Sequence, residues 1–259
     1  MLAGLAACLV DLFLAKRVVH VPMAARIVQM RVAALRICLA AFWAVVHVAV
    51  VVLLAVRRVV WAVCLNNLVV LAGTGNNAGD GFAVARLARA AGIQIQVLQL
   101  GERDRLTGDA LLNASRWSGA GGDWSEFSVL PKATDLIVDA LLGTGLERSV
   151  VGRWAEAIRA VNAHAAPCIS IDVPSGLQAD TGEVLGEAIR AAATVSFIGL
   201  KTGLFTADGP DHAGQICFDD LGVPAAVYAN ELPLARRLAW TAADNALRPP
   251  QRNTHPGHH

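Results

Sequence analysis

Short apolar runs recur along most of this chain, and each one ends in a glycine-rich or acidic turn. The runs are Leu68–Ala72, Ile93–Leu100, Leu136–Ala140, Pro167–Asp172, Thr194–Ile198 and Gln215–Phe218. Runs of this length bounded by turn residues predict buried strands. Amphipathic stretches between them predict helices over Gly79–Ala91, Leu106–Trp117 and Trp154–Ala163. Strands that alternate with helices pair through right-handed crossovers, so we expect an α/β three-layer sandwich around a mainly parallel sheet.

The first part of the chain has a different composition. Up to Val70 there are seven Lys or Arg residues and one acid, which leaves 15 basic and 20 acidic residues in the rest. Ile37–Val56 is twenty residues long and carries no formal charge, and arginines flank it on both sides. These features suit a membrane anchor, a packed helical extension or an out-of-frame translation of a GC-rich gene, and the sequence leaves all three open. We expect an atypical apolar segment over residues 1–66, an α/β domain over 67–240 and a linker over 241–259.

Composition also bounds the partners and the compartment. The acidic balance of the catalytic region argues against nucleic acid, whose phosphates select basic patches. Five cysteines are scattered without C-x-x-C spacing, which is typical of reduced cysteines in a cytoplasmic protein. The expected location is therefore the cytoplasm, with membrane anchoring through Ile37–Val56 as the alternative.

The first turn and the turn after the third run carry glycines in a pattern that suits anion binding. In Gly73–Gly81 (GTGNNAGDG), backbone N–H groups at the start of a helix offer an anion site. The same turn fits the G-x-G-x-x-A form of the dinucleotide fingerprint, which is weak evidence alone. Asp139 ends the third run, and Gly143–Gly145 follow with further N–H donors. The alternative for Asp139 and for the polar residues of the first turn is capping.

Two later turns add a carboxylate, a hydroxyl and a cation. Asp172 and Ser175 lie in the tight turn IDVPSG, where the first suits a general acid/base and the second an oxygen ligand. Lys201 follows the fifth run and is either aimed at the site or a solvated surface charge. In parallel sheets, ligands bind beyond the carboxyl ends of the strands, so we expect all these turns to form one site.

Taken together, the order and spacing of GTGNNAGDG, VDALLGTGL, IDVPSG-x4-TG and K-x-GLF resemble the NAD(P)H-hydrate epimerase family, the YjeF N-terminal domain, over about Val69–Gly222. The resemblance implies a Rossmann-like domain, usually a homodimer. It also implies an isomerase that interconverts the R and S forms of hydrated NADH and NADPH. An ADP- or ATP-dependent dehydratase specific for the S form then restores the cofactors.

The resemblance also assigns residues. It implies catalytic roles for Asp172 and Lys201, although Thr202 stands where the family has proline. It implies a potassium ion held by Asn77, Asp139 and Ser175, and oxygen ligands suit such a hard cation. The substrate would contact Asp172 and two stretches, namely Asn76, Asn77, Ala78, Gly79 and Asp80, and Gly143, Thr144, Gly145, Leu146, Glu147, Arg148 and Ser149.

The two ends of the chain depart from or extend this pattern. The family opens with polar helices, and residues 1–60 do not resemble them. Arg248–His259 resembles the linker and opening of the dehydratase domain found in bifunctional relatives.

In the hydrate, protonation of the C6 hydroxyl lets the ring nitrogen expel water, and water that returns to the other face completes epimerisation. Asp172 is the expected acid and base, and a carboxyl group in this role works best with a pKa raised by burial. One rival is a non-catalytic nucleotide-binding protein on the same fold. The other is an NAD-dependent dehydrogenase, which lacks a clear ribose-binding acid and a catalytic His or Tyr here.

Overall fold

The computed structural model describes residues 65–229 and 233–236. The catalytic part is a compact unit that ends at Pro224. Ala225 begins a second unit, of which the short helix α7 (Ala225–Tyr228) is described. The segments expected at 1–66 and 241–259 lie almost wholly outside the described residues, as does the stretch Ile37–Val56. Within the described ranges, none of the helices has the length and apolar character that a membrane span requires.

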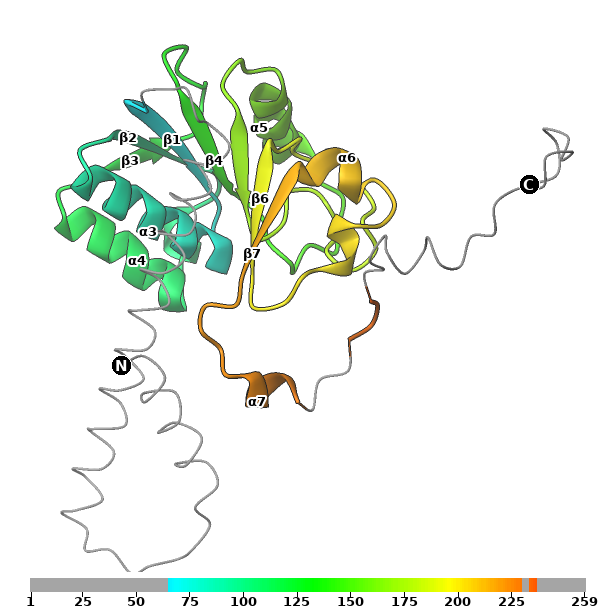
Figure 1. Ribbon diagram of the computed structural model, residues 1–259. Coiled ribbons are helices and arrows are strands. Elements are labelled where there is room, and N and C mark those ends of the chain that lie inside the picture. The colour runs from blue at the N-terminus through cyan, green and yellow to red at the C-terminus, as the bar shows by residue number, and fades with distance from the viewer. Residues whose placement is uncertain (1–64, 230–232, 237–259) are drawn as a thin grey trace, which may run out of the picture. The chain divides into compact units, whose positions relative to one another are not determined.

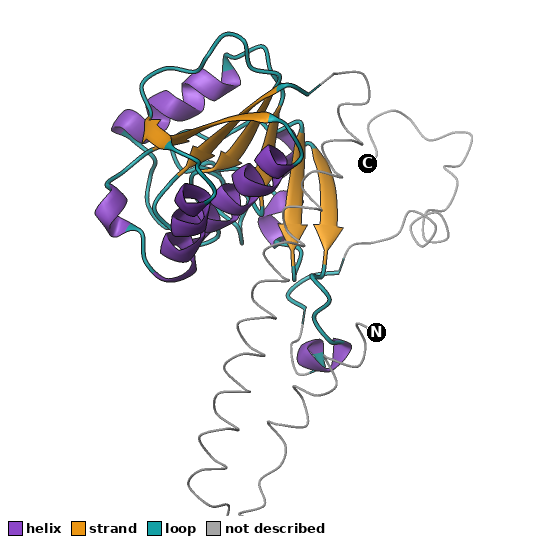
Figure 2. Ribbon diagram, turned by 90° about the vertical axis from the view of Figure 1, so that its left-hand side faces the viewer, coloured by secondary structure: helices purple, strands orange, loops and turns teal. Residues whose placement is uncertain are grey.

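Seven parallel strands form the centre of the unit, in the order β3-β2-β1-β4-β5-β6-β7 (Figures 1 and 2). This confirms the expected α/β fold with a parallel sheet. The strands are β1 (Asn67–Ala72), β2 (Gln94–Gln99), β3 (Trp124–Glu126), β4 (Leu136–Ala140), β5 (Cys168–Ile171), β6 (Ala193–Phe197) and β7 (Gln215–Asp219).

Helices cover both faces of this sheet, as the three-layer expectation requires. The longer ones are α3 (Asn76–Ala90), α4 (Gly108–Gly119) and α5 (Gly152–Asn162), and the short ones are η1 (Arg103–Arg105), η2 (Thr202–Leu204) and α6 (Gly209–Ala213). Side chains of α3 and α4 share one core cluster with the sheet, and side chains of α5 share a second cluster with it. Figure 1 shows α3 and α4 side by side on one face and α5 on the opposite face.

Strand β1 shows why the sequence selects this arrangement. Leu68 and Val70 belong to the core beneath α3 and α4, whereas Val69 and Leu71 belong to the core beneath α5. All four are at most 2% exposed. A strand with apolar residues on both faces must be covered on both, and each such side chain contributes about 1.5–3 kcal/mol on burial.

Helix α3 begins at Asn76, three residues before the predicted start at Gly79. Its later glycines are packing residues rather than turn residues. A Cβ on Gly81 would lie 2.6 Å from the Cβ of Ala140, and one on Gly79 would lie 3.0 Å from the Cα of Ala110. The turn is therefore only Gly73–Gly75, and the glycines beyond it let α3 approach the sheet and α4 closely.

Strand β3 and helix α6 were not predicted, and neither were the short helices η1, η2 and α7. Strand β3 has three residues on the edge of the sheet, too few to show an alternating pattern. Helix α6 has five residues and begins with a Gly-Pro pair, which reads as a turn in sequence.

The two cysteines among the described residues are free and packed in or against the core, as expected. Cys168 and Cys217 are both free thiols. Burial raises the pKa of the Cys168 thiol well above its usual range, so this thiol is unreactive. The three remaining cysteines lie outside the described residues.

Candidate active site

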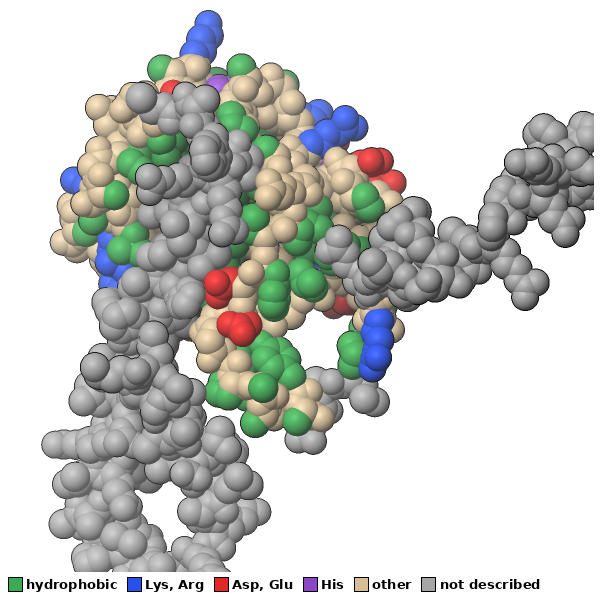
Figure 3. All heavy atoms as spheres, viewed as in Figure 1, with side chains coloured by type: hydrophobic (Ala, Val, Ile, Leu, Met, Phe, Trp, Pro, Cys, Tyr) green, Lys and Arg blue, Asp and Glu red, His purple; other side chains and the backbone are tan. Residues whose placement is uncertain are grey.

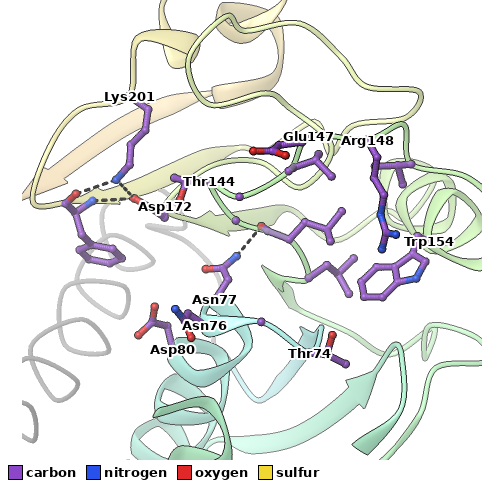
Figure 4. A pocket seen from close by; sticks show the side chains of 18 of the residues that line it. Thr74, Asn76, Asn77, Asp80, Thr144, Glu147, Arg148, Trp154, Asp172 and Lys201 are labelled. Carbon is purple, nitrogen blue, oxygen red and sulfur yellow. Dashed lines mark hydrogen bonds and ion pairs between the residues drawn. The ribbon is translucent and has the colours of Figure 1, made fainter. Parts of the chain in front are cut away.

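A cavity of about 1490 Å³ opens at the carboxyl ends of the strands (Figure 4). It lies beside β1 and β4, where the connections leave in opposite directions and a parallel sheet places its ligands. Its walls come from the turn after β1 and the loop after β4, and from the turns after β5 and β6. The lining residues are Thr74 to Asn77, Asp80, Leu141 to Val151, Trp154, Asp172, Phe197 to Gly199, Lys201 and Leu221.

The floor of the cavity is the start of α3. Gly75 is the N-cap residue, no side chain caps the helix, and its first turn holds no acid. The capping alternative for the Asn pair is therefore wrong. Asn77 instead donates from Nδ2 to the carbonyl of Leu142 at 2.8 Å, which ties α3 to the loop after β4. The uncapped N–H groups and the helix dipole favour an anion in the cavity.

Asp172 occupies a strained turn directly after β5. Its φ angle is +66°, and the N–H of Val173 bonds to the carbonyl of Ile171 at 2.8 Å, which makes Asp172 the centre of a γ-turn. Few non-glycine residues adopt this conformation. The strain turns the side chain toward β6, where Oδ1 accepts the N–H of Phe197 at 3.2 Å and the hydroxyl of Ser196 at 3.3 Å. Such strain tends to be stored at functional sites.

Lys201 reaches Asp172 across this corner of the cavity. Its ammonium group forms an ion pair with Oδ1 of Asp172 and donates to the carbonyl of Phe197 at 2.9 Å. The two side chains are 17% and 22% exposed, so the surface-charge alternative for Lys201 is wrong. The structure therefore brings together the two residues expected to be catalytic. It also places Asp172 beside a positive charge rather than in an apolar pocket.

Asp139 lies beneath the cavity at the end of β4 and is completely buried. It accepts the N–H of Leu141 at 3.2 Å, as the capping alternative predicts, but that is one bond of several. Oδ2 accepts the hydroxyl of Ser170 at 2.8 Å and the N–H of Ser175 at 2.9 Å, and Oδ1 accepts the hydroxyl of Ser175. Burial raises the pKa of Asp139, and the bonds from Ser175 and Ser170 oppose that rise.

Two of the three residues expected to hold potassium, Asn77 and Ser175, meet at one carbonyl group, and the third, Asp139, is bonded to Ser175. The Leu142 carbonyl accepts the amide of Asn77 at 2.8 Å and the hydroxyl of Ser175 at 3.2 Å, and Ser175 also bonds Asp139. The group thus offers one buried carboxylate with hydroxyl, amide and carbonyl oxygens. The described residues contain no cluster of three or more His, Cys, Asp or Glu side chains suited to a metal. This donor set fits a hard, singly charged cation.

Asp80 enters the cavity from the second turn of α3. Figure 4 shows it beside Asn76, on the opposite side from Asp172 and Lys201. Burial, and then the charges of Asp172 and Asp109, raise the pKa of Asp80 to about 7. A carboxyl group with a pKa near 7 can both give and take a proton at neutral pH, which suits acid–base catalysis. The family resemblance placed Asp80 at the substrate, but its raised pKa was not predicted, because burial and the charges of Asp172 and Asp109 arise only in the fold.

The loop after β4 forms the rest of the wall. All seven residues expected at Gly143–Ser149 line the cavity, whereas Ala78 and Gly79 lie in α3 and do not line it. The sequence analysis missed Trp154 and Phe197, which it assigned to a helix and a strand. Figure 4 shows Trp154 beside Arg148 at the far end from Lys201. On the face shown in Figure 3, Lys and Arg side chains are spread around the rim of the described surface and do not form one patch.

Several named proteins are similar to this chain in sequence. The chain is 40% identical over 191 residues to the bifunctional NAD(P)H-hydrate repair enzyme Nnr of Escherichia coli, covering 73% of this chain and 37% of that protein. It is 41% identical over 167 residues to the NAD(P)H-hydrate epimerase of Limosilactobacillus reuteri, covering 63% of this chain and 77% of that protein. It is 40% identical over 178 residues to the bifunctional NAD(P)H-hydrate repair enzyme of Leishmania major, covering 66% and 32%. The chain thus spans about a third of each bifunctional relative.

A solved structure shares the fold. The crystal structure of the yeast protein ynu0 superposes with a TM-score of 0.52 at 24% identity, over 62% of this chain and 70% of that one. At this identity the likeness concerns the fold alone.

The model of the family described as YjeF-related protein N-terminus matches residues 34–203. This match begins well before Val69, where the sequence analysis placed the start of the resemblance, and it covers more than half of the chain. Together with the fold and the four turns that meet in the cavity, it shows that the chain belongs to the YjeF-related N-terminus family.

Proposed function

We propose that this chain is an isomerase that interconverts the R and S forms of hydrated NADH and NADPH, and so contributes to repair of the nicotinamide cofactors. The observation that carries the proposal is the cavity at the start of α3, where an anion site adjoins two carboxyl groups and a lysine. The relatives named NAD(P)H-hydrate epimerase support it, because one of them is 41% identical to this chain over 167 residues and is covered over 77% of its own length.

The size of the cavity and the groups along its walls favour a bound dinucleotide in a single orientation. Its volume of about 1490 Å³ exceeds that of common small-molecule sites, which hold about 300–1000 Å³. The N–H groups at the start of α3 and in Gly143–Gly145 suit the diphosphate. The hydrated nicotinamide ring then lies toward Asp172 and Lys201, where acid–base groups are found, and the adenosine lies toward Trp154.

The reaction requires an acid, a base and surroundings that stabilise a positively charged ring. Protonation of the C6 hydroxyl releases water while the N1 lone pair forms the C6=N1 bond of an iminium ion. The Asp172–Lys201 pair fixes a carboxylate beside this ring, and general acid–base help of this kind is worth about 10²–10⁴-fold in rate.

A potassium ion belongs to the same proposal. Asn77, Asp139 and Ser175 would hold it beneath the cavity, where it would balance the buried carboxylate of Asp139 and stiffen the contact between α3 and the loop after β4. The proposal has three further parts. The chain forms a homodimer, it lies in the cytoplasm with its soluble substrate, and it acts together with a dehydratase specific for the S form.

The direct test starts from the purified R form of hydrated NADH. We expect this chain to convert it to an equilibrium mixture of R and S much faster than the spontaneous reaction does. The two forms are separated by chromatography and their amounts are followed over time. A chain that binds the hydrate without changing the spontaneous rate would instead be the non-catalytic nucleotide-binding protein.

A further inference from the structure

Two carboxyl groups reach the ring end of the cavity from opposite walls. Asp80 projects from α3, and Asp172 projects from the turn after β5. Figure 4 shows them on opposite sides, Asp172 next to Lys201 and Asp80 next to Asn76. They are close enough for the charge of Asp172 to raise the pKa of Asp80. A ring bound between them therefore presents one face to each.

The surroundings of the two groups differ. Three donors hold Asp172, namely Lys201, Ser196 and the N–H of Phe197, and all three use Oδ1. The carboxyl group of Asp80 makes no hydrogen bond or ion pair with any residue in the described ranges, and its pKa is raised to about 7. Near neutral pH, Asp80 can therefore both give and take a proton, whereas three donors hold the side chain of Asp172 in place.

Epimerisation places different demands on the two faces of the ring. The hydroxyl must leave C6 with a proton on one face, and water must lose a proton as it enters on the other. A single carboxyl group serves one face at a time, so it would need the iminium ion to turn over within the site. Two groups on opposite walls remove that need.

We propose, resting on the epimerase function above, that Asp80 and Asp172 are the acid–base groups for opposite faces of the hydrated nicotinamide ring. For the epimer whose hydroxyl faces Asp80, the Asp80 carboxyl group gives its proton to that hydroxyl. The C6–O bond breaks, its electron pair leaves with water, and the N1 lone pair forms C6=N1. A second water adds from the Asp172 side, the C=N pair returns to N1, and Asp172 takes the released proton. One water leaves, one enters, and solvent returns the proton from Asp172 to Asp80. The opposite epimer reacts with the two roles exchanged.

Oxygen exchange separates this arrangement from a single acid–base group. Each pure epimer is incubated with enzyme in ¹⁸O-labelled water, and label and configuration at C6 are followed by mass spectrometry and chromatography, with the spontaneous reaction subtracted. Asp80→Asn and Asp172→Asn are compared with Asp180→Asn, which changes an exposed aspartate outside the cavity. Binding of NADP⁺ by each variant shows that the site is intact.

The wild type and Asp180→Asn should incorporate label with inversion. Each cavity variant should lose inversion by about 10²-fold or more. Each should still exchange the hydroxyl of one epimer with retention, because the remaining carboxyl group can release and recapture water on its own face. The exchanging epimer should differ between the two variants.

Inversion by Asp80→Asn at the wild-type rate would overturn the proposal. Exchange of the same epimer by both variants, or loss of all exchange by both while NADP⁺ still binds, would also overturn it. A wild type that inverts neither epimer would instead contradict the epimerase function itself, so the two failures are distinguishable.

Discussion

At the scale of single residues, the strained backbone at Asp172 decides which substitutions the fold accepts. A φ of +66° is tolerated by Asn and disfavoured by β-branched residues. Asp172→Asn should therefore fold with nearly unchanged stability in urea unfolding and lose most epimerase activity. Asp172→Val should lose about 1–2 kcal/mol of stability as well. Equal stability of the two variants would show that the turn is not strained, and wild-type rates in Asp172→Asn would remove Asp172 from the mechanism.

Asp80 gives a pH-dependent prediction. Its pKa of about 7 in the fold lies above the usual value of 3.8, so folding favours the protonated form. Ionisation of Asp80 therefore does not lower the free energy of unfolding below about pH 4. It lowers that free energy increasingly as pH rises toward 7, and by the full amount above that. Asp80→Asn removes this cost. The variant should gain stability relative to wild type across that window, by something on the order of 1–4 kcal/mol above about pH 8.

The measurement is the free energy of unfolding in urea at a series of pH values. Asp180→Asn is the control, because its exposed carboxylate should give a difference from wild type that does not grow over the same window. A constant difference for Asp80→Asn would contradict the raised pKa.

At the scale of elements, the loops after β4 and β5 are joined through Asp139, and this contact carries the potassium prediction. Ser175 and Ser170 both donate to Asp139, but only Ser175 belongs to the proposed ligand set. Wild type should melt at a higher temperature in potassium chloride than in the chloride of a bulky organic cation. Ser175→Ala and Asp139→Ala should abolish that difference.

Ser170→Ala is the matched control for this pair. It should lose about 1 kcal/mol in either salt and keep the difference between the salts. A wild type with the same melting temperature in both salts would contradict the metal assignment.

The elements also show how far the sequence alone carries the fold. Strand β4 was predicted with its observed bounds, Leu136–Ala140, because a strand buried on both faces is a continuous apolar run with turns on either side. The start of α3 was misplaced, because the glycines at Gly79 and Gly81 suggest a turn until their contacts with α4 and the sheet are known.

The candidate site divides in a similar way. The residues in the four turns were predictable, because the carboxyl ends of parallel strands meet at one edge. The protonation of Asp80, the ion pair of Asp172 with Lys201 and the place of Trp154 in the wall depend on packing between segments far apart in sequence. The sequences of the turns alone do not determine such contacts between distant segments.

At the scale of the whole molecule, the family match alters the view of the N-terminal region. It begins at residue 34, within the segment whose composition suggested an anchor, an extension or an out-of-frame sequence. We therefore expect removal of residues 1–33 to leave epimerisation intact and removal of residues 1–60 to abolish it. Full activity after removal of residues 1–60 would show that this segment is dispensable for the reaction. Sedimentation of the intact chain with membranes, resistant to salt and alkali, would support the anchor.

Catalysed exchange between the two hydrate epimers can be measured by coupling the purified chain to a dehydratase that consumes the S form only. In an R and S mixture, the dehydratase alone should restore NADH from the S fraction rapidly and from the R fraction at the slow spontaneous rate. Addition of the intact chain should make restoration complete in one rapid phase, and Asp172→Asn should leave the slow phase in place. A slow phase unchanged by any concentration of the intact, folded chain would contradict the account.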